Sequence, residues 1–130
     1  MTKVLLVDDN PGMRHVLRAQ MEWMGFAAIT AENGKEGVER AIAEKPDLIL
    51  MDIMMPEMDG WEATRILRAN PDTKEIPILA ITAMFRPVDL QTCIDAGCDD
   101  YIVKPFTVDE LLKKIKALVA KGRLQLDKAP

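Results

Sequence analysis

Three carboxylates, a threonine and a lysine lie at the ends of short apolar stretches of the sequence. Asp8 and Asp9 follow "KVLLV", and Asp52 follows "LILM". Thr82 closes "IPILAIT", and Lys104 follows "DYIV". If these stretches are buried strands, a carboxylate at such an end costs free energy unless a cation or a donor pairs with it. The residue types therefore indicate a site that holds a cation and an anionic group.

Oxygen ligands alone favour a hard cation, and Mg²⁺ is the expected ion because it keeps several waters and shares its coordination with a phosphate. Asp52 offers a carboxylate nucleophile, and Lys104 offers an ammonium group. Thr82 offers a hydroxyl donor beside the small Ala83. A nucleophile, a cation, a donor and a lysine together make a phosphoryl-transfer site.

The elements that must position these groups alternate regularly between strand and helix. The expected strands are residues 3–7, 27–30, 47–51, 76–82 and 100–104. They are rich in Val, Ile and Leu and mostly apolar on both alternations, as in strands buried on both faces of a parallel sheet. The segments between them carry apolar residues at spacings of three and four, which is the period of a helix.

Most of the expected helices begin with a residue that can cap them. Asn10 precedes Pro11 at the first helical position. The fourth helix is expected at about 88–96, with Gly97 ending it. The N-caps that a glutamate follows three residues later, as in a capping box, are Asn33, Asp59 and Thr107. The side chains expected to face the core are Met13, Val16, Leu17, Met21, Met24, Val38, Ala41, Ile42, Ala63, Ile66, Leu67, Leu111, Leu112, Ile115, Leu118 and Val119.

Right-handed crossovers between apolar strands predict a doubly wound α/β fold, with one parallel sheet and helices on both faces. The five-stranded, flavodoxin-like (βα)5 arrangement orders the strands 2-1-3-4-5, so that the first and third strands are neighbours where the order reverses. Ligands bind at that reversal, where Asp8, Asp9 and Asp52 would crowd together. One domain is expected over residues 1–121, followed by a short tail over residues 122–130.

The composition argues against several classes of function. The net charge of −4, from 17 basic and 21 acidic residues, leaves no electrostatic footprint for nucleic acid. No apolar run reaches the ~20 residues that span a bilayer, and "MTKVLLVDDN" has too short an apolar run for a signal peptide. Cys93 and Cys98 match no metal-binding spacing and are expected to be reduced thiols. The expected location is therefore the cytoplasm.

Four motifs in register resemble the receiver domain of bacterial two-component response regulators, in particular the single-domain regulators of the chemotaxis type. The motifs are "LLVDDN", "LILMDIMMPEMDG", "ILAITA" and "DDYIVKPF", in the family's order and at family-like separations. The resemblance covers residues 3 to about 120. It implies a phosphorylated signalling switch of a phosphorelay, which supports its own phosphotransfer and slow autodephosphorylation, and not an enzyme.

The resemblance also implies how the acidic residues act. Asp52 would accept a phosphoryl group from a sensor histidine kinase or a histidine phosphotransfer protein. Asp9 would bind Mg²⁺ directly and Asp8 largely through water, with Asp52 and the backbone carbonyl of Met54 as further ligands. The start "MTK" directly before the first strand favours a natural N-terminus. Because no effector domain is expected beside the receiver, a partner protein is expected to read the phosphorylated state, through the fourth helix, fifth strand and fifth helix. A receiver module cut from a larger regulator or a hybrid kinase is the nearest variant.

The resemblance assigns the remaining matched residues to the phosphoryl group and to the switch. Lys104 and Ala83 would contact the phosphoryl oxygens. Thr82 would hydrogen-bond the phosphoryl group, and Tyr101 would turn inward when Thr82 moves. The Lys104–Pro105 peptide bond would be cis.

Three alternatives have weaker support from the residues. A phosphohydrolase with an aspartate nucleophile usually needs a second Asp two residues later, where this chain has Met54; turnover of free phosphate esters would distinguish it. A dinucleotide-binding module is disfavoured because "VDDNPG" lacks G-x-G-x-x-G. A structural adaptor that never takes a phosphate usually lacks one or more of the acidic residues of the site.

Met54 and Met84 occupy positions that influence attack by water on the phosphoryl group in receivers. Their side chains predict slow loss of phosphate.

Overall fold

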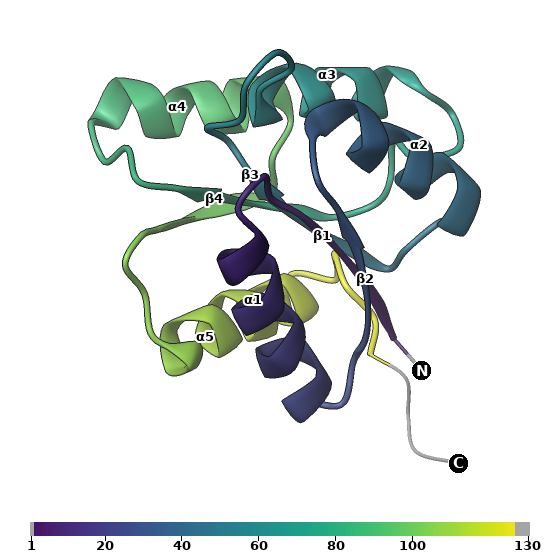
Figure 1. The fold of residues 1–130 in the computed structure, drawn as a ribbon, viewed down its shortest axis with the longest axis vertical. Helices are drawn as coiled ribbons and strands as arrows, with labels where there is room; N and C mark the ends of the chain where they lie inside the picture. Colours follow the sequence, from purple (N-terminus) through teal and green to yellow (C-terminus); the bar gives the residue numbers. More distant parts are fainter. Residues whose placement is uncertain (1, 127–130) are drawn as a thin grey trace.

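The computed structural model describes residues 2–126, along which five strands alternate with five helices (Figure 1). The strands form one parallel sheet in the order β2-β1-β3-β4-β5, which confirms the predicted doubly wound topology. The elements are β1 (Lys3–Val7), α1 (Pro11–Trp23), β2 (Ala27–Ala31), α2 (Gly34–Glu44), β3 (Leu48–Asp52), α3 (Gly60–Ala69), β4 (Ile78–Thr82), α4 (Pro87–Ala96), β5 (Asp100–Val103) and α5 (Val108–Ala120).

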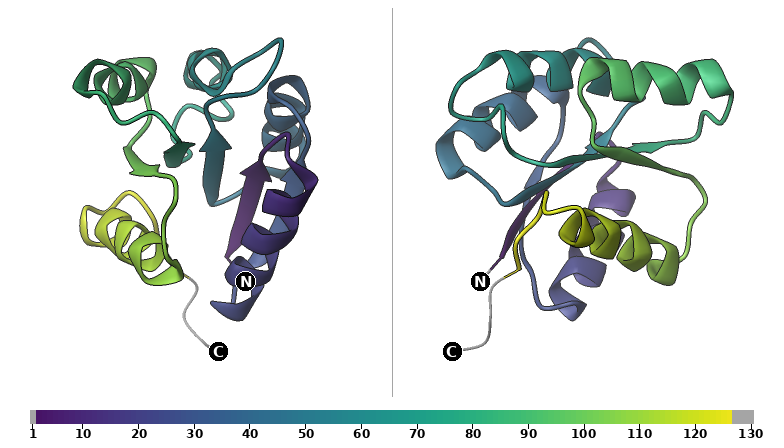
Figure 2. Two further views of the ribbon diagram at one scale, coloured as in Figure 1. Left: turned by 60° about the vertical axis from the view of Figure 1, so that its left-hand side comes forward. Right: turned by 180° about the vertical axis from the view of Figure 1, so that it is seen from behind.

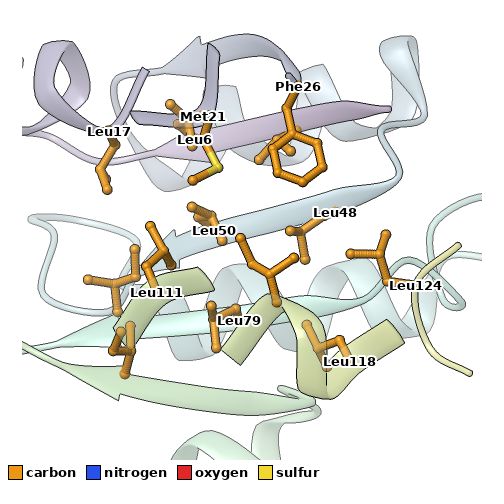
Figure 3. Packing of buried hydrophobic residues seen from close by; sticks show 14 residues of the cluster. Leu6, Leu17, Met21, Phe26, Leu48, Leu50, Leu79, Leu111, Leu118 and Leu124 are labelled. Carbon is orange, nitrogen blue, oxygen red and sulfur yellow. The ribbon is translucent and has the colours of Figure 1, made fainter. Parts of the chain in front are cut away.

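Helices cover both faces of the sheet and bury two apolar clusters. The helices α1 and α5 lie against one face, and α2, α3 and α4 lie against the other (Figures 1 and 2). Leu6 and Leu50 belong to the same buried cluster as Leu17 of α1 and Leu118 of α5 (Figure 3). Leu5 belongs to the opposite cluster, because successive side chains of a strand point to opposite faces. All positions of β3 and β4 are buried, as strands at the centre of the sheet require.

The helices begin where the capping residues predict. The side chains of Asn10, Asn33, Asp59 and Thr107 each accept a hydrogen bond from the backbone N–H three residues later. The helix α4 starts without such a bond, since its N-cap residue is an arginine. It ends at Gly97, whose φ of 115° lies in the left-handed region that favours glycine.

Two of the side chains predicted to face the core are exposed instead, so the prediction is wrong for these two. Val16 is 48% exposed and Ile66 is 37% exposed. Each precedes a fully buried leucine, Leu17 or Leu67, and adjacent residues lie about 100° apart around a helix. The buried face of each helix is therefore narrower than the apolar stripe in its sequence.

Strand ends differ from the prediction by one or two residues. The strand β4 begins at Ile78 instead of residue 76, because Pro77 has no N–H to donate to a neighbouring strand. Two strands differ by one residue at one end, since β2 continues to Ala31 and β5 stops at Val103. The strand β3 covers Leu48–Asp52 and is shifted by one residue at both ends. Along residues 2–126, no helix has both the length and the apolar character needed to cross a membrane.

The chain continues to pack against the domain after α5. Leu124 is buried in the cluster beneath α1 and α5. Arg123 donates a hydrogen bond of 2.6 Å to Asp99, which also accepts one of 2.9 Å from Arg68. The first part of the expected tail therefore contributes to the core, whereas residues 127–130 lie outside the described residues.

Candidate phosphoacceptor site

Three carboxylates meet at the carboxyl ends of β1 and β3. These strands pair directly, with Val7 opposite Met51, so Asp8 and Asp52 each follow one residue of that pair. Carboxylate oxygens of Asp8, Asp9 and Asp52 all lie within 4.8 Å of one another. The predicted crowding at the reversal of strand order is therefore present.

Two of these carboxylates are buried. Asp8 is 1% exposed and Asp52 is 4% exposed, whereas Asp9 faces solvent. Asp8 Oδ1 accepts a 2.9 Å hydrogen bond from the Asn10 N–H, but Asp8 Oδ2 is buried and has no hydrogen-bond donor among the described residues. Arg14 donates a 2.8 Å bond to the Asp8 backbone carbonyl and so fastens α1 to the loop after β1.

Lys104 supplies positive charge from the end of β5. Its Nζ lies 3.6 Å from Asp52 Oδ1 and 3.8 Å from Asp8 Oδ2, which allows attraction but is too long for good hydrogen bonds. The Lys104 N–H donates a 2.8 Å bond to the Thr82 carbonyl, which fixes the lysine beside β4. The Lys104–Pro105 peptide bond is cis, as the resemblance implied.

The surroundings of Asp52 disfavour its ionised form. Burial, together with repulsion from Asp8, raises the pKa of Asp52 to about 6. Attraction to Lys104 and the hydrogen bond from the Met54 N–H act in the opposite direction but do not cancel it. A buried acid with a strongly raised pKa in a cluster of charges is a feature of functional sites.

The loops after β3 and β4 begin with the same hydrogen bond, in which a backbone N–H donates to the side chain two residues earlier. The Met54 N–H donates to Asp52 Oδ1 at 3.4 Å, and the Met84 N–H donates to Thr82 Oγ1 at 3.0 Å. Both methionines line a cavity of about 390 Å³ together with Trp61. Trp61 also donates its indole N–H to Cys93 Sγ on α4, at 3.2 Å.

Gly60 lets the loop after β3 return close to the strand. Its N–H donates a 2.9 Å hydrogen bond to the Ile53 carbonyl. A Cβ atom at this position would lie 2.7 Å from Ile53 Cα and would collide with the backbone oxygen of Asp52. The backbone that carries Asp52 therefore leaves no room for a side chain at residue 60.

A family model described as the response regulator receiver domain matches residues 4–116. The chain belongs to this family. Receiver domains are the phosphoacceptor modules of two-component signalling, and the fold and family predicted from the motifs are confirmed.

Relatives of this receiver domain include one short and one longer protein. Protein PilH of Pseudomonas aeruginosa is 40% identical over 120 residues, which cover 92% of this chain and 99% of PilH. Response regulator MprA of Mycobacterium ulcerans is 37% identical over 127 residues, which cover 98% of this chain but 54% of MprA. The receiver chain thus spans about half the length of the MprA proteins.

Solved structures of receivers share the fold. The chemotaxis protein CheY4 of Vibrio cholerae matches with a TM-score of 0.85 and 32% identity, over 90% of this chain and 98% of CheY4. The receiver domain of sensor histidine kinase PA1611 from Pseudomonas aeruginosa matches with a TM-score of 0.84 and 34% identity, over 92% of this chain and 98% of that domain. That PA1611 domain has a magnesium ion coordinated in its active-site cleft.

The structure places the other residues singled out in the sequence on β4, on β5 and in the loops after β3 and β4. Thr82 is fully buried at the end of β4, and Ala83 lines a cavity that also includes Lys104. Tyr101 is half-buried on β5, where it lies opposite Ala80 of β4. Met54 is 57% exposed and lies in the loop after the strand that carries Asp52.

The acidic cluster of the receiver fits a divalent cation. Its carboxylate oxygens suit a hard ion such as Mg²⁺, and the buried Asp8 Oδ2 has an unfilled acceptor capacity. Two contacts that support the site could not be predicted, namely Arg14 on the Asp8 carbonyl and Lys114 over the Tyr101 ring. Both contacts depend on how side chains from separate elements meet in the folded protein. The sequence shows only that a basic residue lies on a helix, and it does not show which residue this side chain contacts.

Proposed function

We propose that this receiver domain accepts a phosphoryl group on Asp52 from a phosphohistidine of a sensor histidine kinase or a histidine phosphotransfer protein. The observation that carries the proposal is the position of the Asp52 carboxylate, buried beside Asp8 and within 3.6 Å of the Lys104 ammonium. The carboxylate is a nucleophile whose neighbours offer charge stabilisation for an arriving phosphoryl group.

The transfer is an in-line displacement at phosphorus. A carboxylate oxygen of Asp52 forms a bond to phosphorus while the bond from phosphorus to the donor imidazole nitrogen breaks. That nitrogen keeps the electron pair and takes a proton from solvent. Lys104 offsets the charge that gathers on the phosphoryl oxygens, and the small Ala83 leaves room for them near the lysine.

The carboxylates of Asp8, Asp9 and Asp52, with the Met54 backbone carbonyl, would hold Mg²⁺. When bound, the ion supplies positive charge that lets the acidic residues and the phosphoryl oxygens share one cleft. The cluster of carboxylate oxygens and the unpartnered Asp8 Oδ2 support this assignment.

Phosphorylation of Asp52 then changes the balance between two conformations. The acyl phosphate adds about two negative charges near Thr82 and Lys104. The Thr82 hydroxyl turns toward the phosphoryl group, the loop before α4 follows, and Tyr101 turns inward. Shifting an equilibrium from 1:99 to 99:1 takes about 5.5 kcal/mol of differential stabilisation, within reach of a few charge-assisted hydrogen bonds.

The altered surface comprises α4, β5 and α5, where a downstream partner protein of the cytoplasm reads the signal. The acidic net charge of −4 supports a protein partner over nucleic acid or an anionic membrane surface. The domain acts as a signalling module and not as an enzyme that turns over free substrates.

The deciding experiment is incubation with acetyl phosphate, with and without Mg²⁺, followed by mass spectrometry of the intact protein. We expect the mass of one phosphoryl group to appear in Mg²⁺ and to be absent in EDTA or in Asp52→Asn. Asp72→Asn removes a carboxylate from an exposed position and should be phosphorylated like the wild type. Phosphorylation of Asp52→Asn to the same extent as wild type would reject the proposal.

A further inference from the structure

Lys114 of α5 lies against two neighbouring residues of β5. Its Nζ is 5.0 Å from the centroid of the Tyr101 ring, a cation–π distance, and 3.2 Å from Asp100 Oδ1. The Asp100 side chain also accepts a 2.8 Å hydrogen bond from the Tyr101 N–H. The carboxylate therefore holds the ammonium at the face of the aromatic ring.

Tyr101 belongs to β5, an edge strand of the sheet, and is partly buried. It lines a groove between α4 and α5, together with Leu90, Lys113 and Lys114. In the register of the two strands Tyr101 is opposite Ala80, and Thr82 is two residues farther along β4. Opposed and alternate residues share one face of a sheet, so the small Ala80 lies on the path by which the ring would approach Thr82.

We propose that Lys114 is a positioning residue that holds Tyr101 at the outer edge of the sheet and so opposes its inward turn. The ammonium attracts the ring only in the outward arrangement, whereas its contact with Asp100 is available in both. A contact that exists in one state alone shifts the population toward that state. This inference rests on the proposed function, because it takes Tyr101 as the residue that moves when Asp52 is phosphorylated.

The strength of the attraction between Lys114 and Tyr101 depends on how far the two side chains are exposed to solvent. Lys114 and Tyr101 are both partly buried, so the attraction is that of a semi-exposed cation–π contact. Loss of the ammonium should raise the ratio of inward to outward Tyr101 about two- to fivefold. The unphosphorylated protein would thereby move part of the way toward the activated conformation.

The chain offers a direct spectroscopic test because Tyr101 is its single tyrosine. Protein labelled with 3-fluorotyrosine gives one fluorine environment by NMR, which can be followed without Mg²⁺ and with Mg²⁺ plus beryllofluoride as the phosphoryl mimic. Lys114→Met removes the charge and keeps the aliphatic stem, and Lys114→Arg keeps a cation that stacks on aromatic rings. Lys113→Met is the matched control, since Lys113 is exposed on the same groove and carries the same charge.

We expect beryllofluoride to move the wild-type signal to a second position. Without beryllofluoride, Lys114→Met should lie shifted toward that position, while Lys113→Met and Lys114→Arg stay close to wild type. If beryllofluoride moves the wild-type signal but Lys114→Met does not, or Lys113→Met moves it equally, the inference is overturned and the proposed function stands. If beryllofluoride leaves the wild-type signal in place although Asp52 takes the mimic, Tyr101 is not the switch and both assignments to it are rejected.

Discussion

At the scale of single residues, Asp52 is held in surroundings that oppose its charge. Burial and the neighbouring Asp8 raise its pKa to about 6 from the ordinary value of 3.8, and Lys104 compensates only in part. The native state consequently keeps a proton on Asp52 between about pH 4 and pH 6, where the unfolded chain has released it. Over that range the free energy of unfolding falls as the pH rises.

Replacing Asp52 by asparagine should therefore stabilise the protein in the absence of divalent ions. At pH 7.5 in EDTA, the buried charge costs up to about 3 kcal/mol of unfolding free energy, and Asp52→Asn removes it. Urea unfolding measured by circular dichroism would show the variant as the more stable protein at pH 7.5. The difference should shrink toward zero near pH 4, where Asp52 is protonated in the native state.

The exposed Asp72→Asn provides the control for a general charge effect, and it should leave the unfolding free energy nearly unchanged at both pH values. Equal stability of Asp52→Asn and wild type at pH 7.5 would show that the Asp52 charge is fully compensated by its neighbours. Saturating Mg²⁺ should reduce the advantage of the variant, because an ion that binds the native wild type stabilises it by mass action.

That the candidate residues meet at one edge of the sheet could be predicted because of where they fall on their strands. Asp8, Asp52, Thr82 and Lys104 all follow or end a strand of the sheet, and parallel strands bring such ends to one edge. Supporting contacts such as that of Arg14 with the Asp8 carbonyl could not be predicted. They depend on side-chain directions and distances between elements, which neither the apolar period nor a motif specifies.

At the scale of elements, the loops after β3 and β4 determine what would surround the phosphoryl group proposed on Asp52. Met54 and Met84 have backbone N–H groups bonded to Asp52 and Thr82, so their positions relative to the site are set by the strands. Their thioether side chains cannot orient a water molecule by strong hydrogen bonds. Water attack on the acyl phosphate should consequently be slow.

Polar side chains at these two positions should shorten the lifetime of the phosphorylated state. We expect the combined variant Met54→Asn and Met84→Glu to lose phosphate about tenfold faster, a decrease of about 1.4 kcal/mol in the activation free energy. Decay can be followed by intact mass after removal of acetyl phosphate. Met54→Leu with Met84→Leu keeps both side chains apolar and should decay like wild type, whereas an unchanged rate in the polar variant would contradict the explanation.

The sequence predicted the existence and order of the helices and strands better than it predicted which side chains of the helices are buried. Capping residues such as Asn33 and Thr107 place helix starts because a local hydrogen bond decides them. The exposure of Val16 and Ile66 was not foreseeable from the helical period. How wide a face a helix buries depends on the neighbours that pack against it, and those are settled only by the assembled fold.

At the scale of the whole molecule, the segment after α5 connects distant parts of the chain. Arg123 donates to Asp99, and Asp99 also accepts bonds from Arg68 and from the Ile78 N–H. Arg68 in turn donates to the Gly97 carbonyl. The ends of α3, α4 and α5 and the start of β4 are thus held in one polar network.

Leu124 anchors this segment, and its removal should weaken the whole domain. The side chain is 4% exposed and belongs to the cluster beneath α1 and α5 (Figure 3). Leu124→Ala should lower the free energy of unfolding by about 2–5 kcal/mol, because it leaves a cavity in the core. Thermal and urea unfolding would measure this loss.

Leu126 is the matched control, two residues farther along the same segment and 42% exposed. Leu126→Ala should change the unfolding free energy by no more than about 0.5 kcal/mol. If both variants are equally stable, the segment after α5 does not contribute to the cooperative core.

The placement of the two tryptophans gives the protein its own optical reporters. Trp23 is exposed at the end of α1, whereas Trp61 lies beside the site and donates its indole N–H to Cys93. Iodide in solution should quench the fluorescence of Trp23 strongly and that of Trp61 weakly. Because Trp61 shares a cavity with Met54 and Met84, the shielded part of the emission should respond when the loops beside Asp52 rearrange, with no attached dye.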